Sequence, residues 1–292
     1  MAKRKDLADG KARQQESEEE SSSDEDLNML DVEFEWFDPQ PEYDFHGLKA
    51  LLRQLFDVDA QIFDLSALTD IILAQPLLGS TVKVEGNETD PYAFLTVLNL
   101  HEHKDKPVIQ ELILYLARQA KTNPTLSPLT DLLSPSSEAK VGLILTERLI
   151  NVPSEVVPPM YTMLLEEISW AIGDKEPYEF SHYLIPSKTY HEVASMLDQE
   201  SRPPKKKKTK TKAASVQGDS EVFYFHPEDE VLQRHSAVFG GFQYEKQEGE
   251  GQSDARRTFQ ELGIKPQGHM ILIEADKFEA AVNAIGEYLR ST

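Results

Sequence analysis

The chain has 292 residues, of which 51 are Asp or Glu and 30 are Lys or Arg, so its formal net charge at pH 7 is -21. It contains no cysteine, which excludes disulfides, thiolate zinc sites, iron-sulfur clusters and cysteine nucleophiles and is typical of a reducing compartment. The N-terminal residues lack an apolar signal-peptide core, and no stretch approaches the roughly 18 apolar residues that a membrane span requires. We therefore expect a soluble protein that is not secreted by the usual route.

Two polar segments stand apart from the rest of the chain. Residues 1–28 lack aromatic and β-branched residues, so we expect a disordered acidic tail ahead of a single domain at 29–292. Residues 201–219 form a lysine-rich insert that should be exposed and disordered. When residues 1–44 and 201–218 are set aside, the other 230 residues carry 36 acidic and 18 basic side chains, a net charge of -18. Such a surface attracts basic proteins, and it argues against nucleic acid as the main partner and against a membrane.

Apolar periodicity predicts the elements of the N-terminal half. In the first predicted element, Val, Phe and Trp alternate with acidic residues, and this period of two residues is typical of a half-buried strand. Apolar residues that recur every three or four positions mark the helices, and Asp64 is a suitable N-cap for the second helix. In chain order, the predicted elements are a strand at 30–37, helices at 45–56 and 65–75, strands at 82–84 and 92–100, and a helix at 107–121.

The same reasoning applied to the C-terminal half completes a mixed α/β order. A short and wholly apolar run after residue 140 indicates a strand that is buried on both faces. The predicted elements are a strand at 141–145, a helix at 159–171, strands at 178–190, 222–225 and 270–274, and a terminal helix at 276–289 capped by Asp276. We therefore predict a single twisted, mixed β-sheet with helices on both faces.

Catalytic motifs are absent from the sequence. It has no Gly-x-Gly-x-x-Gly, P-loop, His-Glu-x-x-His, Gly-x-Ser-x-Gly or EF-hand pattern. The segment His101-Glu102-His103 places two imidazoles close together, but a zinc site needs a further protein ligand, so a loop or strand end explains it. Carboxylate pairs such as Glu166-Glu167, or Asp254 with Glu261, are unavoidable among 51 acids, and we interpret them as solvated surface. The sequence thus predicts no enzyme, no cofactor and no metal.

A basic run inside the insert is the first feature that suggests a function. A double proline opens it, and its lysines are Lys205, Lys206, Lys207, Lys208, Lys210 and Lys212. An extended, exposed run of this kind fits the acidic groove of a nuclear import receptor. A lipid or RNA patch and an inert linker are the alternatives, and the acidic remainder of the chain disfavours polyanions. The segment Lys3-Arg4-Lys5 is a weaker second signal for import.

The second feature is a serine cluster in the acidic tail. Ser21, Ser22 and Ser23 each have an acidic residue three positions later, which makes them candidate phosphorylation sites for an acidophilic kinase. Phosphates there would deepen the negative charge of a tail that can shield the lysines of a cationic client. The alternative is a tail that only keeps the protein soluble.

The third feature is a set of sequence blocks that closely resembles the BCCIP/Bcp family. The blocks are VEFEWFDPQPEYDFHGLKALLRQLF at 32–56, RLINVP at 148–153 followed by VPPMY at 157–161, and YLIPSKTY at 183–190. The similarity covers about residues 30–290, and the lysine-rich insert is similar to that of the fungal branch. We assign a structural role to the family motif residues Phe34, Trp36, Phe37, Asp38, Pro39, Asp44, Phe45, His46 and Gly47.

The resemblance implies a nuclear protein that works by binding and that shuttles with the cytoplasm. It implies a chaperone or adaptor for a basic ribosomal protein in large-subunit assembly, and a role in protein export from the nucleus. It also implies a fold similar to GNAT acetyltransferases without the acetyl-coenzyme A site.

One segment bears on that missing cofactor site. The GNAT phosphate loop needs small residues before a helix start, whereas the near match at 260–265 ends in Lys265 and is followed by Pro266, so we interpret it as a turn. Two alternatives stay open: an acyltransferase with a degenerate acetyl-coenzyme A loop, and a scaffold for DNA-repair or cell-cycle proteins.

Overall fold

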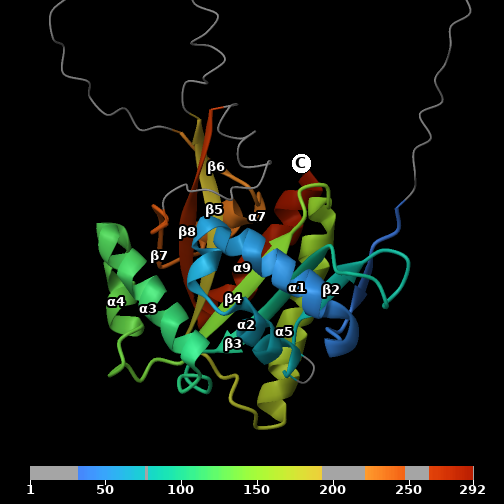
Figure 1. Cartoon of the computed structure of the whole chain (residues 1–292), viewed down its shortest axis with the longest axis horizontal. Coiled ribbons are helices and arrows are strands. Elements are labelled where there is room, and N and C mark those ends of the chain that lie inside the picture. The colour runs from blue at the N-terminus through green and yellow to red at the C-terminus, as the bar shows by residue number, and fades with distance from the viewer. Residues whose placement is uncertain (1–31, 76–77, 193–220, 247–262, 292) are drawn as a thin grey trace, which may run out of the picture. The chain divides into compact units, whose positions relative to one another are not determined.

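A single mixed β-sheet organises the part of the chain that the structure describes. The structure is a computed structural model, and it describes residues 32–75, 78–192, 221–246 and 263–291. Within these residues eight strands form one sheet, in the order β1-β2-β3-β4-β5-β8-β7, with β6 paired to β5 (Figure 1). The strands are β1 (Glu35–Phe37), β2 (Ser80–Lys83), β3 (Ala93–Asn99), β4 (Val141–Arg148), β5 (His182–Glu192), β6 (Val222–Tyr224), β7 (Val238–Phe242) and β8 (Ile264–Glu274).

Strand direction is antiparallel at every pairing except one. Strands β4 and β5 run parallel, and they pair only through the first three residues of each. The pair β5 and β8 is the longest, because all eleven residues of β5 are in register with β8 from His182 opposite Glu274 to Glu192 opposite Ile264. One side of β5 therefore pairs with β8 along its whole length, whereas the other side pairs with β4 at its start and with β6 near its end.

Helices cover both faces of the sheet. One core lies under α1 (Pro41–Phe56), α2 (Leu65–Leu73), α3 (Pro107–Thr122) and α4 (Ser127–Leu132). The second core lies under α5 (Val157–Gly173), α7 (Glu228–Arg234) and α9 (Ala275–Ser291). Short 3-10 turns lie at η1 (Asp57–Ile62), η2 (Pro124–Leu126) and η3 (Ser154–Val156). Successive strand residues point to opposite faces, so Leu143 and Leu145 of β4 join the first core and Ile144 joins the second.

The predicted fold class is confirmed as a mixed α/β fold with one mixed sheet and helices on both faces. The helix at 107–121 is found as α3, and Asp64 caps α2 because its Oδ1 accepts the backbone N–H groups of Ser66 and Ala67, each at 3.1 Å. Among the described residues, no helix combines the length and apolar composition that crossing a bilayer needs.

Several boundaries predicted from the sequence are wrong. Of the strand predicted at 30–37, residues 32–37 are described, and only 35–37 of these form β1. Strand β5 begins at 182 rather than 178. Asp276 lies inside the first turn of α9 rather than at its N-cap. Strand β8 begins at 264, six residues earlier than predicted. The predicted start was too late because the sequence Lys-Pro-Gln-Gly in the first half of the strand favours a turn by local propensity.

Three elements were not predicted from the sequence. Helix α4 has six residues and α7 has seven, which is too short for a helical repeat to be visible. Strand β7 has the sequence VFGGF, and glycine is depleted in strands. Tertiary packing against η2 and β8 forms this strand in spite of its composition.

Gly47 allows α1 to lie directly against the loop before β3. A Cβ at this position would lie 2.4 Å from Cδ of Pro91, and a proline ring cannot turn away. We predict that Gly47→Ala lowers the free energy of unfolding by about 1–3 kcal/mol in urea titrations. The control is Gly173→Ala at the end of α5, where a Cβ meets nothing within 4 Å and the helix should gain about 0.5–1 kcal/mol. Equal effects at the two glycines would refute the packing explanation.

Candidate functional site

The divergence of β4 from β5 creates the most highly charged buried region among the described residues. After the three pairs from Val141 opposite His182 to Leu143 opposite Leu184, β4 turns away, and β6 pairs with the far end of β5 (Figure 1). Polar side chains fill the space between the strands. We call this set the β4–β5 wedge, and its residues are Glu147, Arg148, Ser187, Lys188, His226, Glu228 and Asp229.

Glu147 lies at the centre of the β4–β5 wedge and its side chain is fully buried. Its Oε2 lies 2.6 Å from Nζ of Lys188, and its Oε1 lies 2.9 Å from Nε2 of His226. Gln54 of α1 donates to Oε1 of Glu147 at 3.0 Å and accepts from Nζ of Lys188 through its backbone carbonyl at 2.9 Å. Burial acts to raise the pKa of Glu147, but the Lys188 ammonium and then His226 outweigh it and lower that pKa to about 2. Glu147 is therefore an ionised carboxylate with the Lys188 ammonium at one oxygen and the His226 imidazole at the other.

A second layer of the wedge joins β4 and β5 to α7. Arg148 forms a two-pronged ion pair with Glu228, and the Ser187 hydroxyl donates to Asp229. Burial is the main cause that raises the pKa of Asp229 to about 7, and the neighbouring carboxylate of Glu228 adds to it. Both acids lie in the first turn of α7, where the positive end of the helix dipole favours carboxylates.

The chemistry of the β4–β5 wedge is that of a closed ion network. A lysine, a histidine and carboxylates could transfer protons only to a substrate that reaches them. Lys188, His226, Glu147, Glu228 and Asp229 are all buried. Glu147 pairs with Lys188 and His226, His226 lies 3.9 Å from Glu228, and Asp229 accepts from Ser187. In the described part of the chain, no group of three or more His, Asp or Glu side chains could hold a metal ion. The wedge therefore connects α1, β4, β5 and α7 and offers no open surface to a ligand.

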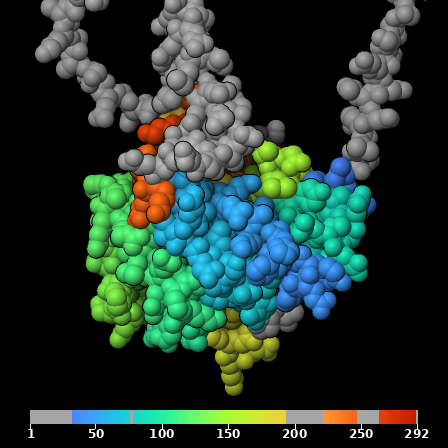
Figure 2. All heavy atoms as spheres, viewed as in Figure 1, coloured from blue at the N-terminus to red at the C-terminus, as the bar shows by residue number. Residues whose placement is uncertain are grey.

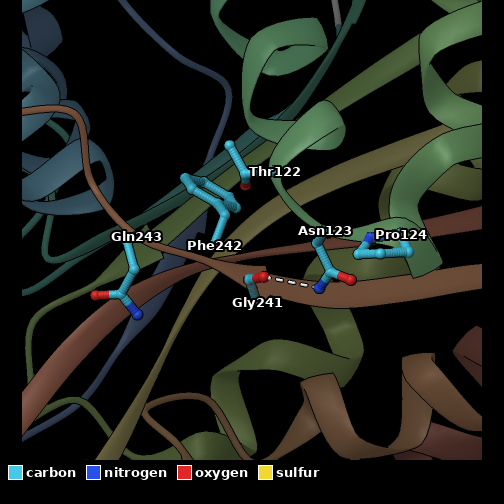
Figure 3. A pocket seen from close by; sticks show the side chains of 6 residues that line it. All are labelled: Thr122, Asn123, Pro124, Gly241, Phe242 and Gln243. Carbon is cyan, nitrogen blue, oxygen red and sulfur yellow. Dashed lines mark hydrogen bonds between the residues drawn. The ribbon is translucent and has the colours of Figure 1, made fainter.

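Two surface hollows among the described residues are lined by residues outside the wedge. One has a volume of about 260 Å³ and is lined by residues of β7 that include Phe242, and there the Asn123 side chain donates to the Gly241 carbonyl at 2.9 Å (Figure 3). Another, of about 250 Å³, lies between Pro158 of α5 and Leu289 of α9. Neither contains a cluster of ionisable side chains, so neither adds a candidate for catalysis.

The family motif residues lie at the corner where β1 leads into α1. The Trp36 indole donates to the Val156 carbonyl at 3.2 Å, which attaches β1 to the turn before α5. Asp44 and Lys83 form a fully buried ion pair at 2.6 Å, and the Lys83 ammonium lies 5.8 Å from the centre of the Phe37 ring. Asp44 also accepts the backbone N–H of Gln40 at 2.7 Å, before the first turn of α1.

The other motif residues make local packing contacts. Phe34 packs edge-on against Tyr92, and Phe45 packs edge-on against His46. Asp38 is exposed, and Pro39 is partly buried. These contacts are those of a packed corner, and the assigned structural role stays a prediction.

Several predicted site residues lie outside the described part of the chain. They are the lysines at 205–208, 210 and 212, the serines at 21–23, and the pair Asp254 and Glu261. His101 and His103 lie in the turn after β3 rather than on a strand. Of the near match at 260–265, residues 263–265 are described: Gly263 has a φ of 79°, and Ile264 and Lys265 begin β8 rather than a helix.

The sequence reasoning missed the β4–β5 wedge. A signal was present, since Glu147 and Arg148 lie only one residue beyond the apolar run at 141–145, and a charge that continues a buried strand needs a partner. The partners could not be assigned, because Lys188 and His226 lie 41 and 79 residues from Glu147 along the chain.

Comparisons with known proteins agree with this architecture. The BCCIP family model matches residues 29–232. Protein bcp1 of Aspergillus oryzae is 61% identical over 294 residues, covering 99% of each chain, and protein bcp1 of Schizosaccharomyces pombe is 48% identical over 264 residues, covering 90% of this chain and 91% of its own. The crystal structure of BCP1 from Saccharomyces cerevisiae has a TM-score of 0.59 at 26% identity, covering 94% of this chain and 98% of that one. The chain belongs to the BCCIP family.

The central carboxylate of the wedge provides a stability test. We predict that Glu147→Gln lowers the free energy of unfolding at pH 7 by about 3–5 kcal/mol, because it leaves Lys188 buried without its counter-charge. The folded pKa of Glu147, about 2, is below the ordinary 4.5, so its contribution is present above pH 4.5 and is lost as the pH falls toward 2. The difference between wild type and variant should therefore shrink over that window. Chemical denaturation at several pH values measures this, with the exposed Glu138→Gln as a control that changes stability by under about 0.5 kcal/mol.

Proposed function

We propose that this BCCIP family member is a non-enzymatic nuclear binding protein. It acts as a chaperone or adaptor for a basic client, such as a large-subunit ribosomal protein, in ribosome biogenesis and in nuclear protein export. The observation that carries the proposal is the charge of the folded surface. The described residues include 34 acidic and 16 basic side chains, and 28 acidic and 13 basic ones remain when the buried ones are left out.

The physical basis of the proposal is the chemistry of ribosomal proteins. Their Lys and Arg side chains are arranged to neutralise RNA phosphates, so the free proteins repel themselves and aggregate with other polyanions. A folded acidic surface can take the place of RNA until delivery. Its carboxylates attract the client at long range, and the interaction reverses when a stronger polyanion competes.

The alternative function, that of an acyltransferase with a degenerate acetyl-coenzyme A loop, has less support. The divergence of the parallel strands β4 and β5 is compatible with a GNAT-like arrangement, which we propose as the origin of the fold. The space between the strands contains the paired charges of the β4–β5 wedge. Gly263 leads into β8 and not into a helix whose N-terminus could bind a pyrophosphate. These features favour a role in binding over catalysis.

Nuclear localisation belongs to the same proposal. The lysines at 205–208, 210 and 212 are the proposed address for an import receptor, and Lys3-Arg4-Lys5 is the second. Export with a client would return the protein to the cytoplasm. The serines at 21–23 would add negative charge to the tail when phosphorylated.

The client hypothesis is tested by binding at two salt concentrations. We expect the full chain to form a stoichiometric complex with a purified basic ribosomal protein of the large subunit near physiological salt. The complex should weaken strongly at about 1 M salt, where the Debye length falls to about 3 Å. A scaffold that binds through apolar contacts would keep its partners there.

The acidic tail provides the control for this experiment. Deleting residues 1–28 should slow association modestly and leave the complex intact, because long-range charge affects the on-rate more than the specificity. Surface plasmon resonance measures both rates. Loss of all binding on this deletion would place the client site outside the folded domain.

The import signal is tested by substitution of the lysine run. Changing Lys205, Lys206, Lys207 and Lys208 to alanine should leave folding intact and reduce nuclear accumulation of a fluorescent fusion several-fold. Changing Lys104 and Lys106, which are exposed before α3, should have no such effect. An unchanged nuclear signal in the first variant would assign import to Lys3-Arg4-Lys5 or to a bound partner.

A further inference from the structure

The C-terminal end of α5 exposes a tryptophan. The chain has two tryptophans, and the side chain of Trp36 is partly buried and hydrogen-bonded to Val156. Trp170 is 64% exposed, and the structure gives its indole no hydrogen bond to any described residue. Ile172, two residues later, is 44% exposed. Tryptophan is among the residues most enriched at the energetic centres of protein interfaces.

Carboxylates lie on both sides of this tryptophan along the helix. Glu166 precedes Trp170 by four residues and Asp174 follows it by four, so the three side chains share one face. The backbone N–H of Asp174 donates to the Trp170 carbonyl at 2.9 Å, which continues the helical geometry to that residue. Residues 166–179 contain five acidic side chains and one lysine, Lys175.

The polarity of the helix makes this placement of acids unfavourable for α5 alone. The C-terminal end of a helix carries partial negative charge and favours cations. Helix α5 has no basic residue in its last turn, and Asp174 is its C-cap residue. A cation from outside the chain would relieve the repulsion that these groups produce.

The exposed face is held rigidly from behind. Leu164, Ile168 and Ala171 pack into the second core. Glu167, predicted from the sequence to be solvated surface, is instead buried and accepts the backbone N–H of Gly79 at 2.7 Å, which attaches the helix to the segment before β2. Figure 1 shows the C-terminal part of α5 and the segment after it extending below the strands of the sheet, and Figure 2 shows the atoms of this part of the chain protruding at the bottom of the molecule. A partner can therefore reach this end of α5 without displacing other described elements.

We propose that Glu166, Trp170 and Asp174, the α5 stripe, form the docking surface for an arginine- and lysine-rich segment of the client. This inference rests on the proposed function and assigns its contact face. A guanidinium or ammonium group stacks on the indole, where the aromatic quadrupole attracts it, and the two carboxylates pair with its hydrogen-bond donors. The aliphatic stem of the same side chain covers the apolar surface.

Charge complementarity selects this occupant and this face. Leu114 is also well exposed, at 57%, but it is aliphatic, and the charges near it on α3 are mixed: Glu111 lies one turn before it, and Arg118, one turn after it, is already paired with Glu245 at 2.8 Å. Phe239 is 43% exposed on β7, where its ring lies 6.3 Å from the ring of the buried His269. Only the α5 stripe, among these exposed apolar sites, places an aromatic ring between two carboxylates.

Substitution on the α5 stripe tests the proposal directly. Trp170→Ala should raise the Kd of the full chain for a basic ribosomal protein about tenfold or more, and Trp170→Phe should restore most of the affinity. Leu114→Ala is the matched control, because it removes an equally exposed apolar side chain, and it should change the Kd less than about twofold. Thermal unfolding of each variant confirms that the fold is kept.

The charges of the stripe are tested separately. Glu166→Gln combined with Asp174→Asn should slow association and flatten its dependence on salt. Asp131→Asn combined with Glu138→Gln removes the same charge from the other side of the sheet, around α4, and should have a clearly smaller effect. Equal effects of the two double variants would mean that net charge, and not this face, directs the client.

Fluorescence gives a readout that uses the two tryptophans. Binding of a tryptophan-free basic ribosomal protein, or of an oligoarginine peptide, should reduce quenching of Trp170 by acrylamide. The variant Trp170→Phe, which keeps only Trp36, should show no such change. If wild type binds the probe while Trp170 stays fully quenchable and Trp170→Ala keeps its affinity, the α5 stripe is not the docking surface and the proposed function stands. If wild type binds neither probe, the proposed function and this inference both fail.

Discussion

The region where β4 diverges from β5 depends on the pairing of one buried carboxylate, that of Glu147. Removing a charge from water costs several kcal/mol, and the cost is offset only when partners surround the charge. For Glu147 these partners are Lys188, His226 and Gln54. They come from β5, from the segment before α7 and from α1, so a single carboxylate requires four distant parts of the chain to meet. A pairing that omits one of them leaves a buried charge alone, which penalises alternative arrangements more than it stabilises this one.

The buried and exposed charges have opposite roles in this protein. Lys83, Arg148 and Lys188 are buried, and each is paired with a carboxylate. The exposed surface keeps more than two acidic side chains for each basic one. These three basic side chains therefore connect elements inside the fold and do not offset the acidic surface. An acidic exterior of this kind fits the proposed capture of a basic client, because self-repulsion at the surface is tolerated when ion pairs and two apolar cores hold the interior.

The sequence predicted the layers of the fold better than its details. Period-two and helical patterns identified the strands and helices whose apolar side chains face a core, and Asp64 was correctly assigned as a cap. Strand β7 was missed because Gly240 and Gly241 give no apolar pattern. Their place depends on distant residues: Asn123 donates to the Gly241 carbonyl, and a Cβ at Gly240 or Gly241 would collide with Asn123 or Gln267. The β4–β5 wedge was missed because its pairs form between residues far apart in the chain. Local propensity and periodicity contain no information on such pairs.

Capture and release make different physical demands on the proposed chaperone. Long-range attraction from many carboxylates accelerates the encounter with any cationic protein, so it gives little discrimination between clients. A fixed aromatic contact acts only at short range and only when a cation is placed against the ring, and it adds the selectivity that charge lacks. The client must later transfer to RNA, whose phosphate density exceeds the carboxylate density of a folded surface. A rigid stripe on one helix end, with the other charges dispersed, allows selective capture while the RNA remains the stronger competitor.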